Sequence, residues 1–274
     1  MDILRLALLS LAAGIAIILG ASLLFQADLT RKTSPLPTTT QRQDQLVSPA
    51  QLHTARIKIE ALIAEASPNY LRFFSQLRQL QPHEYDVILD GFARQSIDGV
   101  DMTNVDSLLS EAVRALRMSS GAMAAKADGP ALSRIFDMQL AMMRALAAKD
   151  PQLCVDFLYG GASPAFFEFS SENRALIANM AIAGLDAINS GRVHRIERAP
   201  PSDKDFELLE HALKAKNLNQ TEIAAILDGK NPSPPIANQR MCQVGEIYLE
   251  TLAALPEPAR FRIYALAVEL MARS

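Results

Sequence analysis

The two cysteines, Cys154 and Cys242, have the side chains whose chemistry depends most on their surroundings. Cys154 stands among apolar residues in PQLCVDFLYGG, and Cys242 shares an expected helical face with apolar neighbours, so both should point inward. In an oxidising compartment, two inward cysteines about 90 residues apart could form a disulfide worth about 4 to 5 kcal/mol in the chain-entropy description. The alternative is two buried thiols that pack as small hydrophobes.

The densest basic cluster lies in the segment GRVHRIERAPP, residues 191–201, which contains Arg192, His194, Arg195 and Arg198. Such a cluster could contact acidic lipid headgroups or a partner protein. A polar, proline-ended segment is also typical of a solvated loop that contributes little to packing.

Catalytic and metal-binding patterns are weak. The chain has no HExxH and no CxxC, and its four histidines are scattered, so we expect no metal and no cofactor. Glu246 and Glu250 lie one helical turn apart and could support acid–base chemistry, but such a pair is more typical of a solvated face. A nucleophilic cysteine would need a basic neighbourhood that neither cysteine has. The sequence therefore predicts no catalytic residues, and an enzyme is the less favoured class.

The N-terminal segment indicates where these side chains are located. Leu6 to Phe25 is a run of twenty residues without charge, about 30 Å long as a helix, which matches the hydrocarbon thickness of a bilayer. We expect residues 1–27 to be an uncleaved transmembrane signal-anchor that contacts the lipid bilayer. The alternative is a signal peptide cleaved after Ser22, although the run is longer than the usual 7 to 15 residues.

The orientation of the anchor depends on its flanks. Arg31, Lys32 and Arg42 follow the span, and counting them alone would hold the C-terminal side in the cytoplasm. The very short N-terminus and the Thr/Pro/Gln-rich stalk of residues 28–48 favour export instead. We therefore expect a single-pass inner-membrane protein whose C-terminal domain is periplasmic, with the cytoplasm-facing arrangement as the alternative.

Residues 49–274 are long enough for a substantial core. The chain carries a net charge of −3 and no Trp, and its basic residues are dispersed, which argues against a nucleic-acid partner. The segment 191–201 could divide this domain in two.

The helix signals are the strongest pattern in the sequence. A capping side chain precedes proline at 48–49, 67–68, 150–151 and 163–164, and capping-box spacing joins Thr103 to Asp106 and Ser202 to Asp205. Apolar residues recur with helical period between these marks, and no stretch alternates like a strand. We predict an all-α domain of about ten to twelve helices. Gly129, Gly160, Gly191 and Gly229 are expected where helices stop, and Gly129–Pro130 is also a weaker candidate for the start of the next helix. Residues 119–129 are expected to form a mobile connection.

The phrase ALAAKDPQLCVDFLYGG, with a later cysteine-containing helix and a closing LPEPARFRIYAL helix, resembles the style of small bacterial envelope proteins. No motif in it transfers a residue role. The function class that these features favour is a membrane-anchored interaction or scaffold protein that binds a protein partner of the envelope. The alternatives are a cytoplasm-facing adaptor of the same fold and an enzyme acting on envelope material.

Overall fold

The computed structural model describes residues 47–160, 163–230 and 232–273, and these residues form twelve α-helices, one 3-10 helix and no strand. The all-α class is therefore confirmed. The predicted anchor, 1–27, and nearly all of the stalk, 28–48, lie outside the described residues. Within the described ranges no helix has both the length and the apolar character needed to cross a bilayer. The helices are α2 (Pro49–Ala66), α3 (Pro68–Leu80), α4 (Pro82–Ile97), α5 (Val105–Ser120), η3 (Gly121–Lys126), α6 (Gly129–Lys149), α7 (Pro151–Leu158), α8 (Pro164–Glu172), α9 (Arg174–His194), α10 (Asp203–Ala215), α11 (Gln220–Asp228), α12 (Asn238–Ala254) and α13 (Glu257–Arg273).

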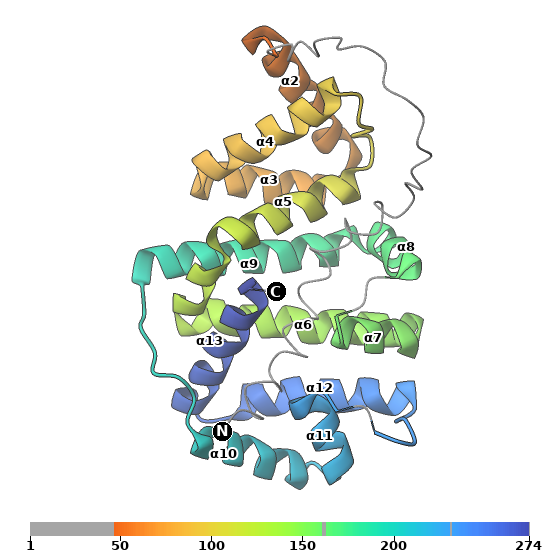
Figure 1. The fold of residues 1–274 in the computed structure, drawn as a ribbon, viewed down its shortest axis with the longest axis vertical. Helices are drawn as coiled ribbons and strands as arrows, with labels where there is room; N and C mark the ends of the chain where they lie inside the picture. The colour runs from red at the N-terminus through yellow and green to blue at the C-terminus, as the bar shows by residue number, and fades with distance from the viewer. Residues whose placement is uncertain (1–46, 161–162, 231, 274) are drawn as a thin grey trace, which may run out of the picture.

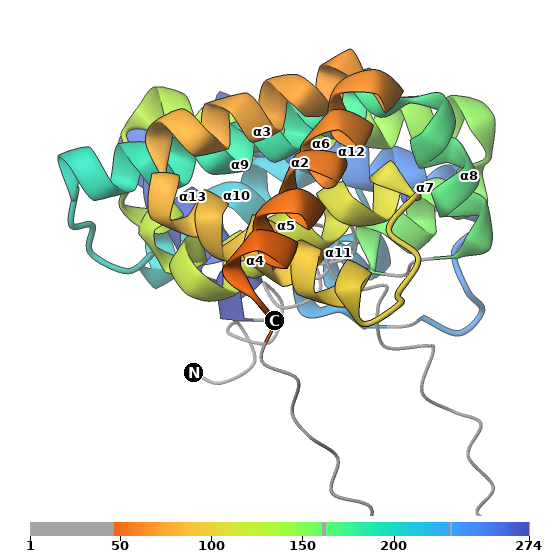
Figure 2. The ribbon, with the colours of Figure 1, turned by 90° about the horizontal axis from the view of Figure 1, so that it is seen from above.

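The helices are stacked along the long axis, with α2 to α4 at one end and α10 and α11 at the other (Figure 1). Viewed down that axis, α2 runs obliquely across α3 and α4, against which it packs (Figure 2). The order in space departs from the order in sequence, because α9 lies between α5 and α6 and also packs on α3 and η3. The closing helix α13 crosses this layer and contacts η3, α5, α6 and α12. The middle of the stack therefore joins early, central and late parts of the chain.

The predicted helix starts are largely confirmed. Ser48, Ser67, Asp150 and Ser163 each accept a hydrogen bond from a backbone N–H of the helix they cap, and proline follows each of them. Ser202 and Asp205 form the expected capping box of α10. The predicted box of Thr103 and Asp106 is wrong, because the Asn104 side chain caps α5 instead. Asp106 is held elsewhere, by Tyr70 and Arg174.

Two of the four predicted glycine stops are confirmed. Gly160 follows α7, and Gly229 is the left-handed cap of α11 with φ of 60°. Gly129 opens α6, as the weaker helix start predicted at Gly129–Pro130 implies, whereas Gly191 lies inside α9, which continues to His194. A Cβ on Gly191 would lie 1.8 Å from the carbonyl oxygen of Met123, so this position allows η3 to approach α9 rather than ending the helix.

The small-residue segment 119–129 is more regular than predicted. Its residues 121–126 form η3, which packs against α9 and α13. Ala124 and Ala127 are buried, and the Ile196 amide donates to the Lys126 carbonyl at 2.9 Å. Small side chains let three backbones approach one another here, which sequence periodicity does not report.

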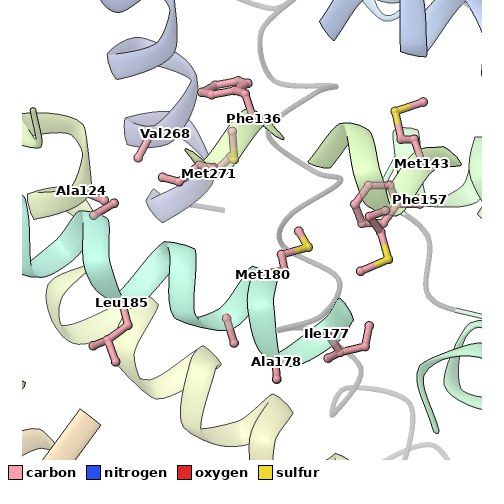
Figure 3. Close-up of a cluster of buried hydrophobic side chains, with 14 of the residues drawn as sticks. Ala124, Phe136, Met143, Phe157, Ile177, Ala178, Met180, Leu185, Val268 and Met271 are labelled. Carbon is pink, nitrogen blue, oxygen red and sulfur yellow. The ribbon is translucent and has the colours of Figure 1, made fainter. Parts of the chain in front are cut away.

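Buried apolar side chains form one cluster through the described residues, from Ala55 in α2 to Met271 in α13. Figure 3 shows part of it, where side chains from α6, α7, α9 and α13 meet. Met142 and Met143 are fully buried, so the methionines of α6 fill the core. Phe136 and Tyr264 stack with ring centroids 3.7 Å apart and fix α6 against α13.

Candidate functional site

The structure joins Cys154 of α7 to Cys242 of α12 by a disulfide, with their Cα atoms 5.8 Å apart. Both residues are buried, as their apolar neighbours predicted. The bond closes a sequence separation of 88 residues. It lies beside a close helix contact, since a Cβ on Gly245 of α12 would approach Met143 of α6 to 2.4 Å. The cysteines therefore fasten α12 to the layer formed by α6 and α7.

The basic cluster is split by its contacts rather than gathered at one surface. Arg192 forms an ion pair with Glu84 of α4 and donates to the Ser120 hydroxyl at 2.7 Å. This pairing with Arg192 holds the pKa of the Glu84 carboxyl below its usual range. His194 Nε2 lies 3.5 Å from an oxygen of Asp128.

The rest of the cluster secures the connection from α9 to α10. Arg198 donates to the carbonyls of Ala125 and Ala127, at 3.2 and 2.7 Å, and its guanidinium lies over the Phe261 ring. Arg195 ends α9 in a left-handed conformation and remains exposed. The expectation that this segment contributes little to packing is wrong for Arg192 and Arg198, because both tie distant elements together.

The carboxylates Glu246 and Glu250 share an arginine. Arg144 of α6 forms an ion pair with Glu250, and its Nε lies 3.7 Å from Glu246. All three side chains are partly exposed, so the group joins α6 to α12 at the surface. No group of three or more His, Cys, Asp or Glu in the described ranges could hold a metal ion.

Two bidentate ion pairs connect helices to one another. Arg262 of α13 makes a bidentate pair with buried Asp205, and Arg240 of α12 does the same with Glu222. Both carboxylates sit in the first turn of a helix, and each also accepts a backbone N–H at the helix cap. The Arg262 pairing lowers the pKa of Asp205 to about 2, with burial opposing and hydrogen bonds from Ser202 adding to the effect. These groups hold α10 and α11 in place, which is a structural role.

A pocket of about 100 Å³ lies where α5, η3, α9 and α13 meet, and it is partly open to solvent. Its walls are almost wholly apolar. Five of its lining residues are labelled in Figure 3: Ala124, Met180, Leu185, Val268 and Met271. Gly184 of α9 also lines it, and a Cβ at this position would meet no atom within 4 Å. The missing side chain of Gly184 therefore keeps part of the pocket empty.

Arg117 is the single charged residue among those that line this pocket. Its Nη1 donates to the Met271 carbonyl at 3.2 Å, while its buried Nε has no hydrogen-bond partner in the described part of the chain. Burial lowers the pKa of Arg117, and the nearby charge of Arg114 lowers it further. An arginine so placed stays protonated, so the pocket combines an apolar interior with one positive charge.

Sequence reasoning did not find this pocket. Gly184 was the available signal, because a glycine inside a helix costs about 1 kcal/mol relative to alanine and so calls for a packing or functional reason. Arg117 gave no signal, since it follows the apolar stripe of α5 as an ordinary helix-end arginine. The pocket needs α9 between α5 and α6 and α13 across them, an arrangement that the local pattern does not specify.

The described residues form an all-α domain with a small apolar pocket, which is lined by helices from different parts of the sequence. Comparison with known proteins adds no relative, since no family profile, no curated protein and no solved structure matches the chain.

Proposed function

We propose that the chain is a membrane-anchored binding protein of the bacterial cell envelope, whose helical domain docks a protein partner. Leu6–Phe25 would anchor it in the inner membrane, and residues 28–48 would hold the domain away from the bilayer. The observation that supports a binding role is the apolar pocket between α5, η3, α9 and α13. Stable protein contacts are commonly centred on an apolar side chain inserted into such a pocket.

The size of the pocket suits a small apolar side chain of the partner. An apolar cavity of ~150 Å³ is known to take up benzene, and this pocket is smaller, about 100 Å³, and open on one side. It therefore fits one aliphatic side chain rather than an aromatic ring. Gly184 lines the pocket and has no side chain, so a partner can approach the backbone of α9 closely.

A periplasmic location is favoured by the disulfide between Cys154 and Cys242. Disulfides persist in oxidising compartments and are rare in reducing ones. The cytoplasm-facing adaptor remains the alternative. A periplasm-dependent reporter fused after Ser274 should be active, and the full-length chain should stay in the membrane after alkaline carbonate washing. Activity of a cytoplasm-dependent reporter alone, or a mature form that begins near Leu23 in the soluble periplasm, would contradict this location.

The docking role can be tested with two matched glycine variants. Gly184→Leu places a side chain in the pocket, whereas Gly91→Leu places the same side chain on α4, where a Cβ would meet no atom within 4 Å. Both exchanges raise helix propensity by about 0.8 kcal/mol. In membranes, chemical cross-linking of the full-length protein should trap a partner with wild type and Gly91→Leu but not with Gly184→Leu. Equal cross-linking by all three would remove the pocket from the docking site. Turnover of an envelope substrate would favour the enzyme alternative.

A further inference from the structure

The positive charge of Arg117 at the pocket wall indicates which chemical class of occupant the pocket favours. Two other half-buried arginines, Arg174 and Arg262, each face a carboxylate with two nitrogens of the guanidinium group. Arg117 forms no ion pair with a carboxylate of the described residues, and it donates a hydrogen bond to the backbone carbonyl of Met271. Its buried Nε has no partner in the described part of the chain. A partly buried guanidinium in this state gains most from an anion.

The neighbouring charges do not satisfy Arg117. Arg114, one turn earlier on α5, is engaged with Glu111 and repels Arg117. The remaining lining residues are apolar, from Phe73 of α3 to Ala272 of α13, so they offer no acidic side chain. The pocket therefore provides an apolar cavity with the positive charge of Arg117 at its wall, which favours an occupant that carries a negative charge.

We infer that the occupant of this pocket is an aliphatic carboxylate, whose apolar group enters beside Gly184 and whose carboxylate accepts hydrogen bonds from Arg117. This inference rests on the proposed binding function and adds the chemistry that the pocket selects. The proposed docking function assigns this group to an aliphatic residue next to a carboxylate in the partner protein. A free aliphatic acid is the other outcome that the test distinguishes.

The chemistry can be tested on the full-length chain in lipid nanodiscs, with three probes that share one aliphatic group: 4-methylpentanoate, 4-methylpentanol and 4-methylpentylamine. Ligand-observed NMR titration should show that wild type binds the carboxylate at least about tenfold more tightly than the alcohol or the amine, because hydrogen bonds to a charged group contribute about 1.5 to 3 kcal/mol. Gly184→Leu should abolish binding of the carboxylate and the alcohol. Gly91→Leu should bind both like wild type.

The role of Arg117 is tested by two methionine variants on α5. Arg117→Met should weaken the carboxylate about tenfold, to the affinity of the alcohol, and leave the alcohol unchanged. Arg114→Met removes a charge outside the pocket lining and should change the carboxylate affinity by less than about threefold. Circular dichroism of each variant checks that the helices are intact.

The outcomes separate the inference from the function on which it rests. If none of the probes binds wild type in a saturable way, the pocket is not a binding site and both proposals fail. If all three bind equally and Gly184→Leu abolishes them, the binding function stands and the carboxylate inference is overturned. A carboxylate preference that survives Arg117→Met would also overturn the assignment to Arg117.

Protein purified from membranes then shows whether the bound carboxylate belongs to a free aliphatic acid or to a partner protein. Solvent extraction and mass spectrometry of wild type, with Gly184→Leu as the control, should recover an aliphatic acid if the ligand is free. A photo-reactive methionine analogue in place of Met180, which lines the pocket and whose replacement adds little bulk, should instead cross-link to an aliphatic residue beside Asp, Glu or a chain end if the source is a protein. A cross-linked segment without any carboxylate within two residues would refute the inference.

Discussion

The ion pair between Asp205 and Arg262 leads to a prediction about stability and pH. Asp205 is 5% exposed and lies in the first turn of α10, where it meets the Arg262 side chain of α13 and caps its own helix. Its pKa is lowered from 3.8 to about 2, first by the hydrogen bonds from Arg262 and then by those from Ser202. The ionised carboxylate is therefore more stable in the folded protein than in the unfolded chain.

The magnitude follows from the difference between these two pKa values. One pKa unit corresponds to about 1.4 kcal/mol, so ionised Asp205 contributes about 2 kcal/mol to the free energy of unfolding at neutral pH. Because the folded pKa is the lower one, this contribution is complete above about pH 5 and is lost as the pH falls from about 4 towards 2. Asp205→Asn should therefore lower the free energy of unfolding by about 2 kcal/mol at pH 7 and by about half as much at pH 3.

Urea unfolding followed by circular dichroism, between pH 7 and pH 3, measures this difference. Asp203→Asn is the matched control, since Asp203 lies in the same helical turn but is exposed and outside the capping box. It should change stability by no more than about 0.5 kcal/mol, as expected of a surface position. A constant loss for Asp205→Asn across the pH range, or an equal loss for Asp203→Asn, would refute the reasoning.

Two further predictions concern covalent and backbone constraints. Protein recovered without reduction should show no free thiol by mass spectrometry, and replacing Cys154 and Cys242 together by Ala should lower stability by about 4 kcal/mol; full alkylation of both thiols in unreduced protein would contradict the pairing. Gly191→Ala should lower the melting temperature clearly, because its Cβ would lie 1.8 Å from the Met123 oxygen, while Gly91→Ala should raise it slightly; similar shifts in a thermal scan would show that the Gly191 contact is unimportant.

Local chemistry by itself determined most of the secondary structure. A Ser or Asp oxygen followed by proline is a self-contained helix start, and it specified α2, α3, α7 and α8 without reference to the rest of the chain. Apolar period identified the buried face of α5, where Leu108, Leu109 and Ala112 are buried. These signals succeed because each depends on residues within one or two helical turns.

Only the tertiary structure decided how glycines and charges are used. Gly191 ends no helix, because the approach of η3 to α9 requires the absence of a Cβ, and Arg198 spans from a loop to backbone carbonyls about 70 residues away. The pocket with Gly184 and Arg117 exists because α9 inserts between α5 and α6 and α13 crosses them. Contacts of this kind join residues far apart in sequence, so neither periodicity nor capping could predict them.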